Sequence, residues 1–408
     1  MSGEMSASGT LPATLKGLTE AYTDPHGCYD ALRDRDRISF DPASRSWLVT
    51  GHEAVRKILS DERFVSDVAL AVPQPQRSTR RSFIMDAVQR QIIFTDGPKQ
   101  AKVQRAVLVE LARRSDSLVV PLAAAARTLV EHARERREVD LLADFAIPYS
   151  MEAISMVLGL PTPGPGEVAQ LERWSTTFAN VTSGYLKGNV EEIALLGEYF
   201  RAQVAARRGT PSDDLIGAFL RDGGLDGEED VVIQCVMAFA AGRVTTQKLL
   251  GSGIPLLLPV WGAWRERIQA SPASLRRLTD ELLRVVTPTR YVARYATVDV
   301  PTDDGSGGGA TIRRGERVVL FLEAANRDSK AFSDPHTLVA DRQPNPHLAF
   351  GFGPHRCPGA SIARIEIQVA LQALLETLVE VRPHPSLPPT WEPNPNLGGY
   401  ASYPCLCA

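Results

Sequence analysis

The sequence predicts a mainly α-helical protein with a smaller β region, folded as a single large domain. Three observations lead to this fold class. Apolar residues recur at helical spacing through most of residues 98 to 250. Strand-like runs are few and short, and they lie near the N-terminus and after residue 290. No internal repeat or linker divides the chain, and 408 residues with 44% hydrophobic residues can bury one large core.

The N-terminal part is expected to contain a flexible segment and a small sheet. Residues 1 to 22 are predicted to be flexible, so the single domain is assigned to residues 23 to 408. Ser46–Val49 is a strand-like run, and a helix is predicted from about Glu53 to Ser60. The mixed pattern from Ser66 to about Gln91 predicts a long loop with one short helix, and such loops are usually functional or disordered.

The central helical block ends before a predicted β-hairpin. Turn signals at residues 160–166 and 222–224 divide the block into separate helices. Two strands are then predicted at Tyr291–Val300 and Arg317–Leu322. Between them stands PTDDGSGGG, whose glycines and aspartates suit a solvent-exposed hairpin tip. The hairpin therefore belongs to a minor β region on a helical body.

Composition narrows the class of function. The net charge of −3 gives no basic excess of the kind that nucleic-acid binding requires. No stretch reaches the roughly 18 apolar residues of a membrane span, and MSGEMSASGT is not a secretion leader. The five scattered cysteines, an odd number, do not suggest a disulfide framework. We therefore expect a cytoplasmic protein without nucleic-acid or membrane partners.

The stretch FGFGPHRCPG, residues 350–359, carries the strongest functional signal. It places Cys357 between a glycine-rich turn and the start of an amphipathic helix. Gly351 and Gly353 allow a flat cofactor to lie close to the backbone. The free N–H groups and the dipole of a helix N-terminus favour an anion, which predicts a lowered pKa for the Cys357 thiol. This is a suitable setting for a thiolate that binds a metal.

Two other interpretations of this cysteine were weighed. A single loop cysteine is most often structural. A zinc site is disfavoured because the candidate ligands offer neither a CxxC pair nor a compact histidine pair on one helix. Those candidates are His336, His347, His355 and Cys357. Cys405 and Cys407, near the C-terminus, are interpreted as ordinary thiols.

The whole pattern Phe-Gly-x-Gly-x-His-x-Cys-x-Gly, followed by Ala363-Arg364, resembles the signature of the cytochrome P450 family. The resemblance is to the soluble bacterial type. It implies the cytochrome P450 fold, with haem b (iron protoporphyrin IX) between a long distal helix and the proximal helix after the cysteine loop. Cys357 would then be the metal ligand, and Phe350, Gly351 and Gly359 would contact the cofactor.

A second mark lies in the helical segment from about Glu229 to Leu250. At about 100° per residue, Met237, Ala240 and Thr245 fall within about 40–100° of Ala241, so small and apolar groups share one face with a hydroxyl. A porphyrin could pass close to that face. A helix contact lined by small residues is the alternative. With the cysteine loop, the segment resembles the family's distal helix.

The resemblance also shows a departure at the candidate catalytic positions. In the family an acid and a threonine of the distal helix deliver protons to the dioxygen that the iron activates. Thr245 matches the threonine, but Val244 stands where the acid belongs and cannot relay a proton. Arg243 lies about 200° around the helix from Ala241. It is therefore interpreted as a partner for an acidic residue of another element.

Haem carries two propionates, which call for cations or strong donors. By resemblance, Arg294 and His355 match propionate contacts. The family also uses a histidine and an arginine four residues apart on an early helix, and Gln100 and Gln104 stand at these positions. Glutamine donates without charge, which suggests weaker anchoring or a different pairing. A plain solvated helix face is the alternative for both.

Glu281 and Arg284 lie three residues apart on one predicted helical face, where they can pair. Taken alone, such a pair is usually an exposed one. The resemblance implies a buried pair that is locked to Arg342 and holds the cysteine loop in shape. These three residues are therefore interpreted as structural.

The function implied by the resemblance is that of a haem-thiolate monooxygenase. A thiolate ligand favours O–O cleavage and attack on unactivated C–H bonds. The substrate is expected to be a small natural-product biosynthetic intermediate, with electrons from NAD(P)H through a separate reductase and ferredoxin. Residues expected to line its pocket are Met237, Ala240, Thr289, Arg290 and Tyr400.

Two other functions stay open. Because Val244 replaces the acid, the chemistry could be atypical: oxidative coupling, peroxide-driven oxidation, or rearrangement of a substrate with an N–O bond. The other is a haem-binding sensor or carrier without turnover, which the retained Thr245 disfavours.

Overall fold

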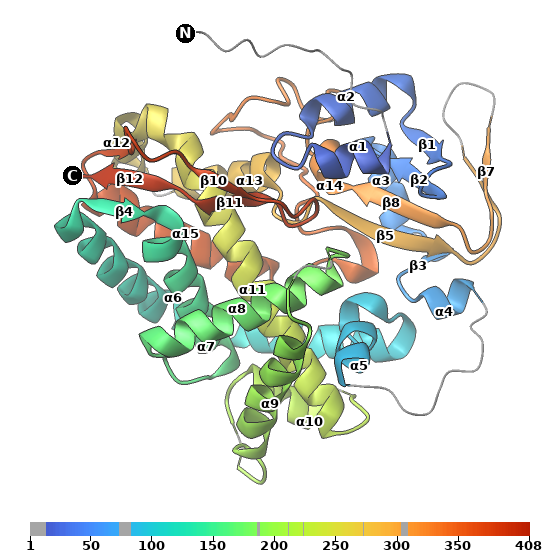
Figure 1. The fold of residues 1–408 in the computed structure, drawn as a ribbon, viewed down its shortest axis with the longest axis horizontal. Helices are drawn as coiled ribbons and strands as arrows, with labels where there is room; N and C mark the ends of the chain where they lie inside the picture. Colours follow the sequence, from blue (N-terminus) through green and yellow to red (C-terminus); the bar gives the residue numbers. More distant parts are fainter. Residues whose placement is uncertain are drawn as a thin grey trace.

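The computed structural model describes residues 14–72, 83–185, 188–210, 212–222, 224–271, 273–302 and 309–408. It contains a large helical body and a smaller β region at one side (Figure 1). The mainly α fold class predicted from the sequence is thus confirmed.

The helical body is built from helices of very different length. They are α6 (Gly97–Arg136), α7 (Ile147–Leu158), α8 (Pro165–Thr182), α9 (Glu191–Ala205), α10 (Leu215–Asp222), α11 (Glu228–Leu257), α12 (Trp261–Ala270), α13 (Ala273–Val286) and α15 (Ala360–Thr377). Short helical turns join them: η1 (Ile92–Phe94), η2 (Leu141–Ala146), η3 (Leu258–Val260) and η4 (Gly353–His355). Figure 1 shows α11 running through the middle of this body.

The packing of the body follows from its apolar residues. Two thirds of the residues in α11 are buried, and they lie on several sides of the helix. It is therefore a central core helix rather than a surface helix. It packs against α7, α8 and α9, while α15 lies along α6 and also contacts α13. The helix predicted from about Glu229 to Leu250 is therefore α11, extended at its C-terminal end.

The β region centres on a five-stranded sheet with the order β1-β2-β8-β5-β3. Its strands are β1 (Ile38–Asp41), β2 (Ser46–Val49), β3 (Phe64–Val65), β5 (Tyr291–Ala296) and β8 (Arg317–Phe321). Strand β2 runs parallel to β8, and the other pairs are antiparallel. All four residues of β2 are buried, which explains its apolar sequence.

Smaller ladders complete the β structure. They comprise β4 (Glu138–Asp140) with β12 (Pro404–Cys407) and β9 (Val381–Pro383), β10 (Thr390–Glu392) with β11 (Gly399–Ser402), and β6 (Val300–Pro301) with β7 (Thr311–Ile312). The predicted hairpin is formed by β5 and β8, and β6 and β7 extend it toward the tip. The predicted tip spans Pro301 to Gly309, and its residues 303–308 lie outside the described residues.

The N-terminal region agrees with the sequence only in part. Helix α1 (Leu15–Glu20) falls inside the segment that was expected to be flexible, and its Leu18 is buried against the sheet region. Residues 1–13 of that segment lie outside the described residues. Helices α2 (His26–Arg35), α3 (His52–Ser60), α4 (Val68–Ala71) and α14 (Leu322–Ala325) also lie on the side of the sheet, whereas α5 (Phe83–Gln89) lies against the helical body.

The predicted loop from Ser66 to about Gln91 contains two short helices rather than one, α4 and α5. The residues between them, 73–82, lie outside the described part of the chain. Helix α5 contacts α9 and α11, so this segment lies over the central helix.

One described helical stretch, Leu141–Leu158, is long and apolar enough to cross a membrane by length and composition alone. It comprises η2 and α7, is 67% buried, and packs against α6 and α11. Asp144 and Glu152 interrupt its apolar run.

Candidate functional site

The loop that precedes α15 presents Cys357 at the start of that helix. Gly351 (φ 66°) and Gly353 (φ 72°) adopt left-handed backbone conformations that favour glycine. A Cβ atom at Gly353 would lie 2.3 Å from the carbonyl oxygen of Leu59, so only glycine fits against α3. The Cys357 N–H donates to the carbonyl oxygen of Phe350 at 2.8 Å, which closes the loop.

The Cys357 thiol has a raised pKa, contrary to the prediction from the sequence. Burial is the largest cause. The Gly359 N–H and the charges of Arg356 and Arg364 lower the pKa but do not offset burial. The position of Cys357 before a helix is therefore not enough to deprotonate its thiol in this fold. A bound metal ion would do so, because coordination deprotonates a thiol.

Along α11 the accessible face differs slightly from the predicted one. Ala241 is exposed in the middle of a core helix, and Met237 and Thr245 are half-buried. The Thr245 hydroxyl donates to the carbonyl oxygen of Ala241 at 2.8 Å. Ala240 (1% exposed) and Val244 (4% exposed) are instead buried. The Ala240 side chain packs in the hydrophobic core, and the expectation that it lines a pocket stays a prediction.

Arg243 points from α11 toward α8. It is fully buried and donates to Ser175 Oγ (2.8 Å), Thr176 Oγ1 (2.6 Å) and Gln247 Oε1 (2.6 Å). Burial lowers the pKa of its guanidinium. The Glu172 carboxylate lies 3.9 Å away, so Arg243 has the acidic neighbour on another element that its helical position predicts.

Arg294 on β5 is a buried cation with few hydrogen-bond partners within the described ranges. Its side chain is 6% exposed, and within the described ranges its guanidinium makes one hydrogen bond, to the carbonyl oxygen of Ala293 (2.8 Å). Burial lowers its pKa to about 10, partly opposed by Asp96. An arginine has five N–H donors, so several remain for an anionic group. The residue therefore fits the haem propionate that the resemblance assigns to it.

His355 has a protein partner. Its Nε2 lies 2.9 Å from Asp96 Oδ1, and the other carboxylate oxygen of Asp96 accepts the N–H groups of Ser66 and Asp67. Burial would raise the pKa of Asp96, but the hydrogen bond from His355 and those two N–H groups lower it overall. Asp96 thus ties the cysteine loop to the segment after β3.

Gln100 and Gln104 both reach the cysteine loop. Gln100 Nε2 donates to the carbonyl oxygen of Pro354, and Gln104 Nε2 donates to that of Arg356, each at 3.1 Å. Gln100 is buried, which excludes the solvated-face alternative for that residue. The sequence placed both near the propionates, but their partners in the structure are backbone carbonyls.

A buried network of Glu281, Arg284 and Arg342 holds the chain that leads into the cysteine loop. Arg284 donates to both carboxylate oxygens of Glu281 (2.9 and 2.8 Å), and both side chains are fully buried. Arg342 Nε lies 3.1 Å from Glu281 Oε1, and the Val339 N–H donates to the same oxygen at 2.8 Å. Burial would raise the pKa of Glu281, but these donors lower it overall. The network joins α13 to residues 335–345.

The remaining residues predicted for the pocket, Arg290, Thr289 and Tyr400, have different surroundings. Arg290 is buried, and its Nε lies 3.2 Å from a carboxylate oxygen of Glu323. Its place in the pocket wall stays a prediction. Thr289 is half-buried. Tyr400 on β11 packs in an aromatic cluster, with ring centroids 4.1 Å from Trp391 and 4.8 Å from Tyr403.

Two acidic residues near the site were missed by the sequence analysis. Asp96 stands before Gly97-Pro98, where a helix start was the evident role. Glu366 on α15 is 5% exposed and accepts the Thr246 hydroxyl of α11 at 2.9 Å. Burial raises the pKa of Glu366 to about 7. The available signal was a single carboxyl group between two isoleucines of an apolar helix.

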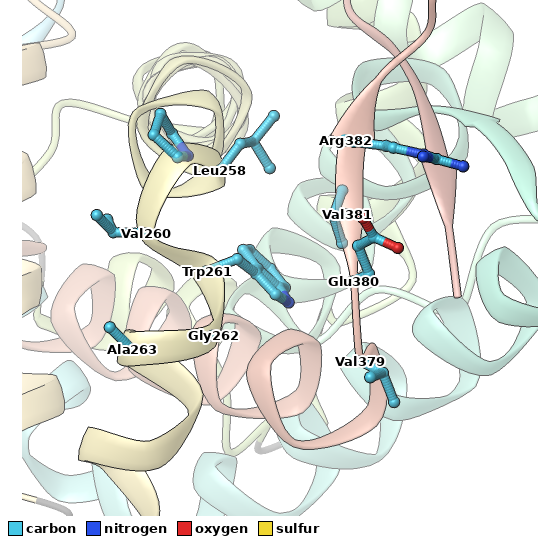
Figure 2. Close-up of a pocket in the computed structure, with 10 residues that line it drawn as sticks. Leu258, Val260, Trp261, Gly262, Ala263, Val379, Glu380, Val381 and Arg382 are labelled. Atoms are coloured by element: carbon cyan, nitrogen blue, oxygen red, sulfur yellow. The ribbon is translucent and has the colours of Figure 1, made fainter.

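A surface groove of about 550 Å³ lies away from this site. Figure 2 shows it between the start of α12 and the chain that leads into β9, with Trp261 on one side and Val381 and Arg382 on the other. No residue of the cysteine loop or of the accessible face of α11 lines it.

Comparison with known proteins agrees with this geometry. The family described as Cytochrome P450 matches residues 274–397, which include Glu281 and Cys357. The 20-oxo-5-O-mycaminosyltylactone 23-monooxygenase of Streptomyces fradiae is 32% identical over 365 residues, covering 87% of this chain and 83% of that protein. The biotin biosynthesis cytochrome P450 of Bacillus subtilis (strain 168) is 28% identical over 377 residues, covering 90% of this chain and 92% of that protein.

Among solved structures, P450BioI in complex with an acyl carrier protein ligated to hexadec-9Z-enoic acid superposes with a TM-score of 0.84 at 25% identity. The match covers 96% of this chain and 100% of that one. The long match to the Streptomyces monooxygenase and the shared fold lead to one conclusion. The chain belongs to the cytochrome P450 family.

Proposed function

We propose that this monooxygenase acts on a small natural-product biosynthetic intermediate, and that Cys357 would hold haem b through its thiolate. The observation that carries the proposal is the Cys357 loop, closed by its own N–H bond to Phe350 and joined directly to α15. The relatives support the substrate class, because one is named a 20-oxo-5-O-mycaminosyltylactone 23-monooxygenase and another a polyketide biosynthesis cytochrome P450.

Each residue has a distinct part in this proposal. When bound, haem b supplies the activation of dioxygen, which an electron-rich thiolate promotes. Arg294 holds a propionate with its remaining donors. Ala241, with its small side chain, allows the cofactor to approach α11, and Thr245 presents a hydroxyl one turn further on. The buried Glu281 network keeps the chain before the loop in place.

Family members of bacterial type take electrons from redox partner proteins. For this chain we propose a ferredoxin and an NAD(P)H-dependent ferredoxin reductase, and a cytoplasmic location. Reconstitution with one such pair tests the assignment. Electron uptake and product formation from a macrolide-type or polyketide-type substrate would support it, whereas stable ligand binding without reduction would favour a sensor or carrier.

The ligand assignment has a direct spectroscopic test. The reduced, haem-loaded protein is mixed with carbon monoxide, and the position of its Soret band is recorded. A band typical of thiolate ligation supports Cys357 as the ligand. The same band in Cys357→Ser, which lacks the sulfur, would contradict the assignment.

A second candidate function is atypical P450 chemistry, and Val244 favours it. Its side chain is 4% exposed and carries no proton to give. The deciding measurement mixes the reduced, haem-loaded protein with dioxygen, adds a second electron chemically and quantifies hydrogen peroxide. Nearly complete release as peroxide points to reactions that bypass the usual proton delivery. Mostly water or oxidised product supports the monooxygenase with another proton donor.

The substitution Val244→Asp tests the cause of any peroxide release. If the missing acid limits proton delivery, Val244→Asp should lower the fraction released as peroxide by at least about tenfold, because one acid–base group typically contributes about 10²–10⁴-fold. Val244→Asn has the same shape without the acid and should leave that fraction unchanged. Equal fractions in the parent and both variants would rule out this cause.

A further inference from the structure

The first turns of α6 hold the peptide that precedes Cys357. Gln104 Nε2 donates to the carbonyl oxygen of Arg356 at 3.1 Å. The N–H of the same peptide unit belongs to Cys357 and donates to Phe350 at 2.8 Å. Both polar groups of the peptide between Arg356 and Cys357 are therefore bound. A peptide plane that is held at both ends cannot rotate without losing a hydrogen bond.

Gln100 acts one turn earlier on the same loop. Its Nε2 donates to the carbonyl oxygen of Pro354 at 3.1 Å and also contacts Gln104 Oε1. A glutamine amide has two N–H groups, so Gln100 has no donor left. Its side chain is 5% exposed, which fixes its orientation within the packed contact of α6 with α15.

The same loop is bound through a side chain as well. His355 pairs with Asp96, the residue before α6, at 2.9 Å. Three successive loop residues, 354 to 356, thus each contact the start of α6. Two of these contacts run from neutral amide N–H groups to backbone carbonyl oxygens, a pairing that involves no charge.

We infer that Gln100 and Gln104 are positioning residues for the thiolate loop, and that the propionates are left to Arg294. The two glutamines act through the backbone on either side of His355, and so fix the direction in which Cys357 presents its sulfur. Arg294, buried with unused donors, takes the anionic part of the cofactor. This inference rests on thiolate ligation in the family and not on the proposed substrate or redox partners.

The test uses the haem-loaded full-length protein and needs no substrate. Gln104→Met and Gln100→Met keep a side chain of similar size and remove the amide N–H groups that donate to the loop. Hydrogen exchange of residues 350–358 should become about fivefold faster in either variant, the size of one net hydrogen bond, and more in the pair. The reduction potential should shift, and the carbon-monoxide complex should show a larger fraction with protonated sulfur.

Two further variants make the result specific. Gln372→Met alters an exposed glutamine on α15 whose amide, among the described residues, bonds to Glu376 alone, and it should match the parent in all three measurements. Gln104→Lys restores a donor at the loop and should return the exchange rate and the carbon-monoxide spectrum toward parent values.

Parent-like loop exchange and reduction potential in Gln104→Met and Gln100→Met would overturn the inference. So would faster haem loss with unchanged loop exchange, since the amides would then bind the cofactor. Either result would leave the proposed substrate and redox chain untouched, because neither measurement involves turnover.

Discussion

Glu366 is a carboxyl group with almost no access to water, on a helix that was predicted from its apolar residues alone. Its one described partner is the Thr246 hydroxyl at 2.9 Å, and burial raises its pKa from 4.5 to about 7. No cation lies close enough to pair with it among the described residues. Ionising it inside the fold is therefore costly.

This raised pKa predicts a pH dependence of stability. The folded state holds the proton more tightly than the unfolded state, so the stabilising effect is fully present below pH 4.5 and is lost as the pH rises through about 7. Across this pH window the parent should lose roughly 3 kcal/mol in the free energy of unfolding. We expect Glu366→Gln to show no such loss, because its side chain does not titrate. Denaturant unfolding at several pH values measures it. Glu376→Gln, an exposed change on the same helix, should behave as the parent, and parallel pH profiles for all three proteins would contradict the prediction.

Arg294 shows the opposite imbalance, since it is a buried cation that forms no ion pair within the described residues, with Asp96 as its nearby negative charge. We expect Arg294→Leu to release haem at least about tenfold faster, because a charge-assisted hydrogen bond contributes about 1.5–3 kcal/mol. The cofactor-free protein should be no less stable, because the leucine removes the cost of burying an under-paired guanidinium. Haem transfer to an acceptor protein and unfolding of the cofactor-free protein measure the two effects. Arg294→Lys, which keeps the charge, should retain haem better than Arg294→Leu, and equal loss in both would contradict a charge role.

At the scale of elements, the contact of α13 with the chain before the cysteine loop depends on one carboxylate. Glu281 accepts from Arg284 and Arg342, and Arg284 also donates to the carbonyl oxygens of Asn326 and Thr337. One buried carboxylate therefore keeps two guanidinium groups paired and orders a long irregular segment. Removing it leaves both cations without their anion.

We expect Glu281→Gln to lower the free energy of unfolding by about 3–5 kcal/mol, the range for breaking a buried ion pair. The fraction of protein that retains haem should fall as well. Chemical denaturation and the haem-to-protein ratio check the two outcomes. Asp341→Asn is the control, since Asp341 is 46% exposed and pairs with Arg267 and Arg277 at the surface, where a change within about 0.5 kcal/mol is normal. A similarly small effect for Glu281→Gln would show that the Glu281 network does not stabilise residues 335–345.

At the scale of the whole molecule, the order of helices and strands was readable but their arrangement was not. Ser46–Val49, the helix after it and the hairpin around PTDDGSGGG all follow from local periodicity and turn residues. The parallel pairing of β2 with β8 joins residues about 270 positions apart, and no local pattern encodes it. The assignment of residues 23 to 408 to one domain stays a prediction.

The sequence by itself determined the family motif, the place of Cys357 before a helix, and the neighbours Val244 and Thr245, because these depend only on chain order. It also predicted that Arg243 turns away from Ala241, since helical geometry sets that angle. Local order is enough wherever a residue's role depends on its immediate neighbours.

Only the tertiary structure decided what lies beside each of these groups. It showed burial raising the pKa of Cys357, Ala240 turned into the core, and Gln104 bound to a carbonyl more than 250 residues away. Burial and partner choice arise from segments distant in sequence that pack together. A periodic pattern identifies a helix and one of its faces, but the groups that meet that face come from the rest of the fold.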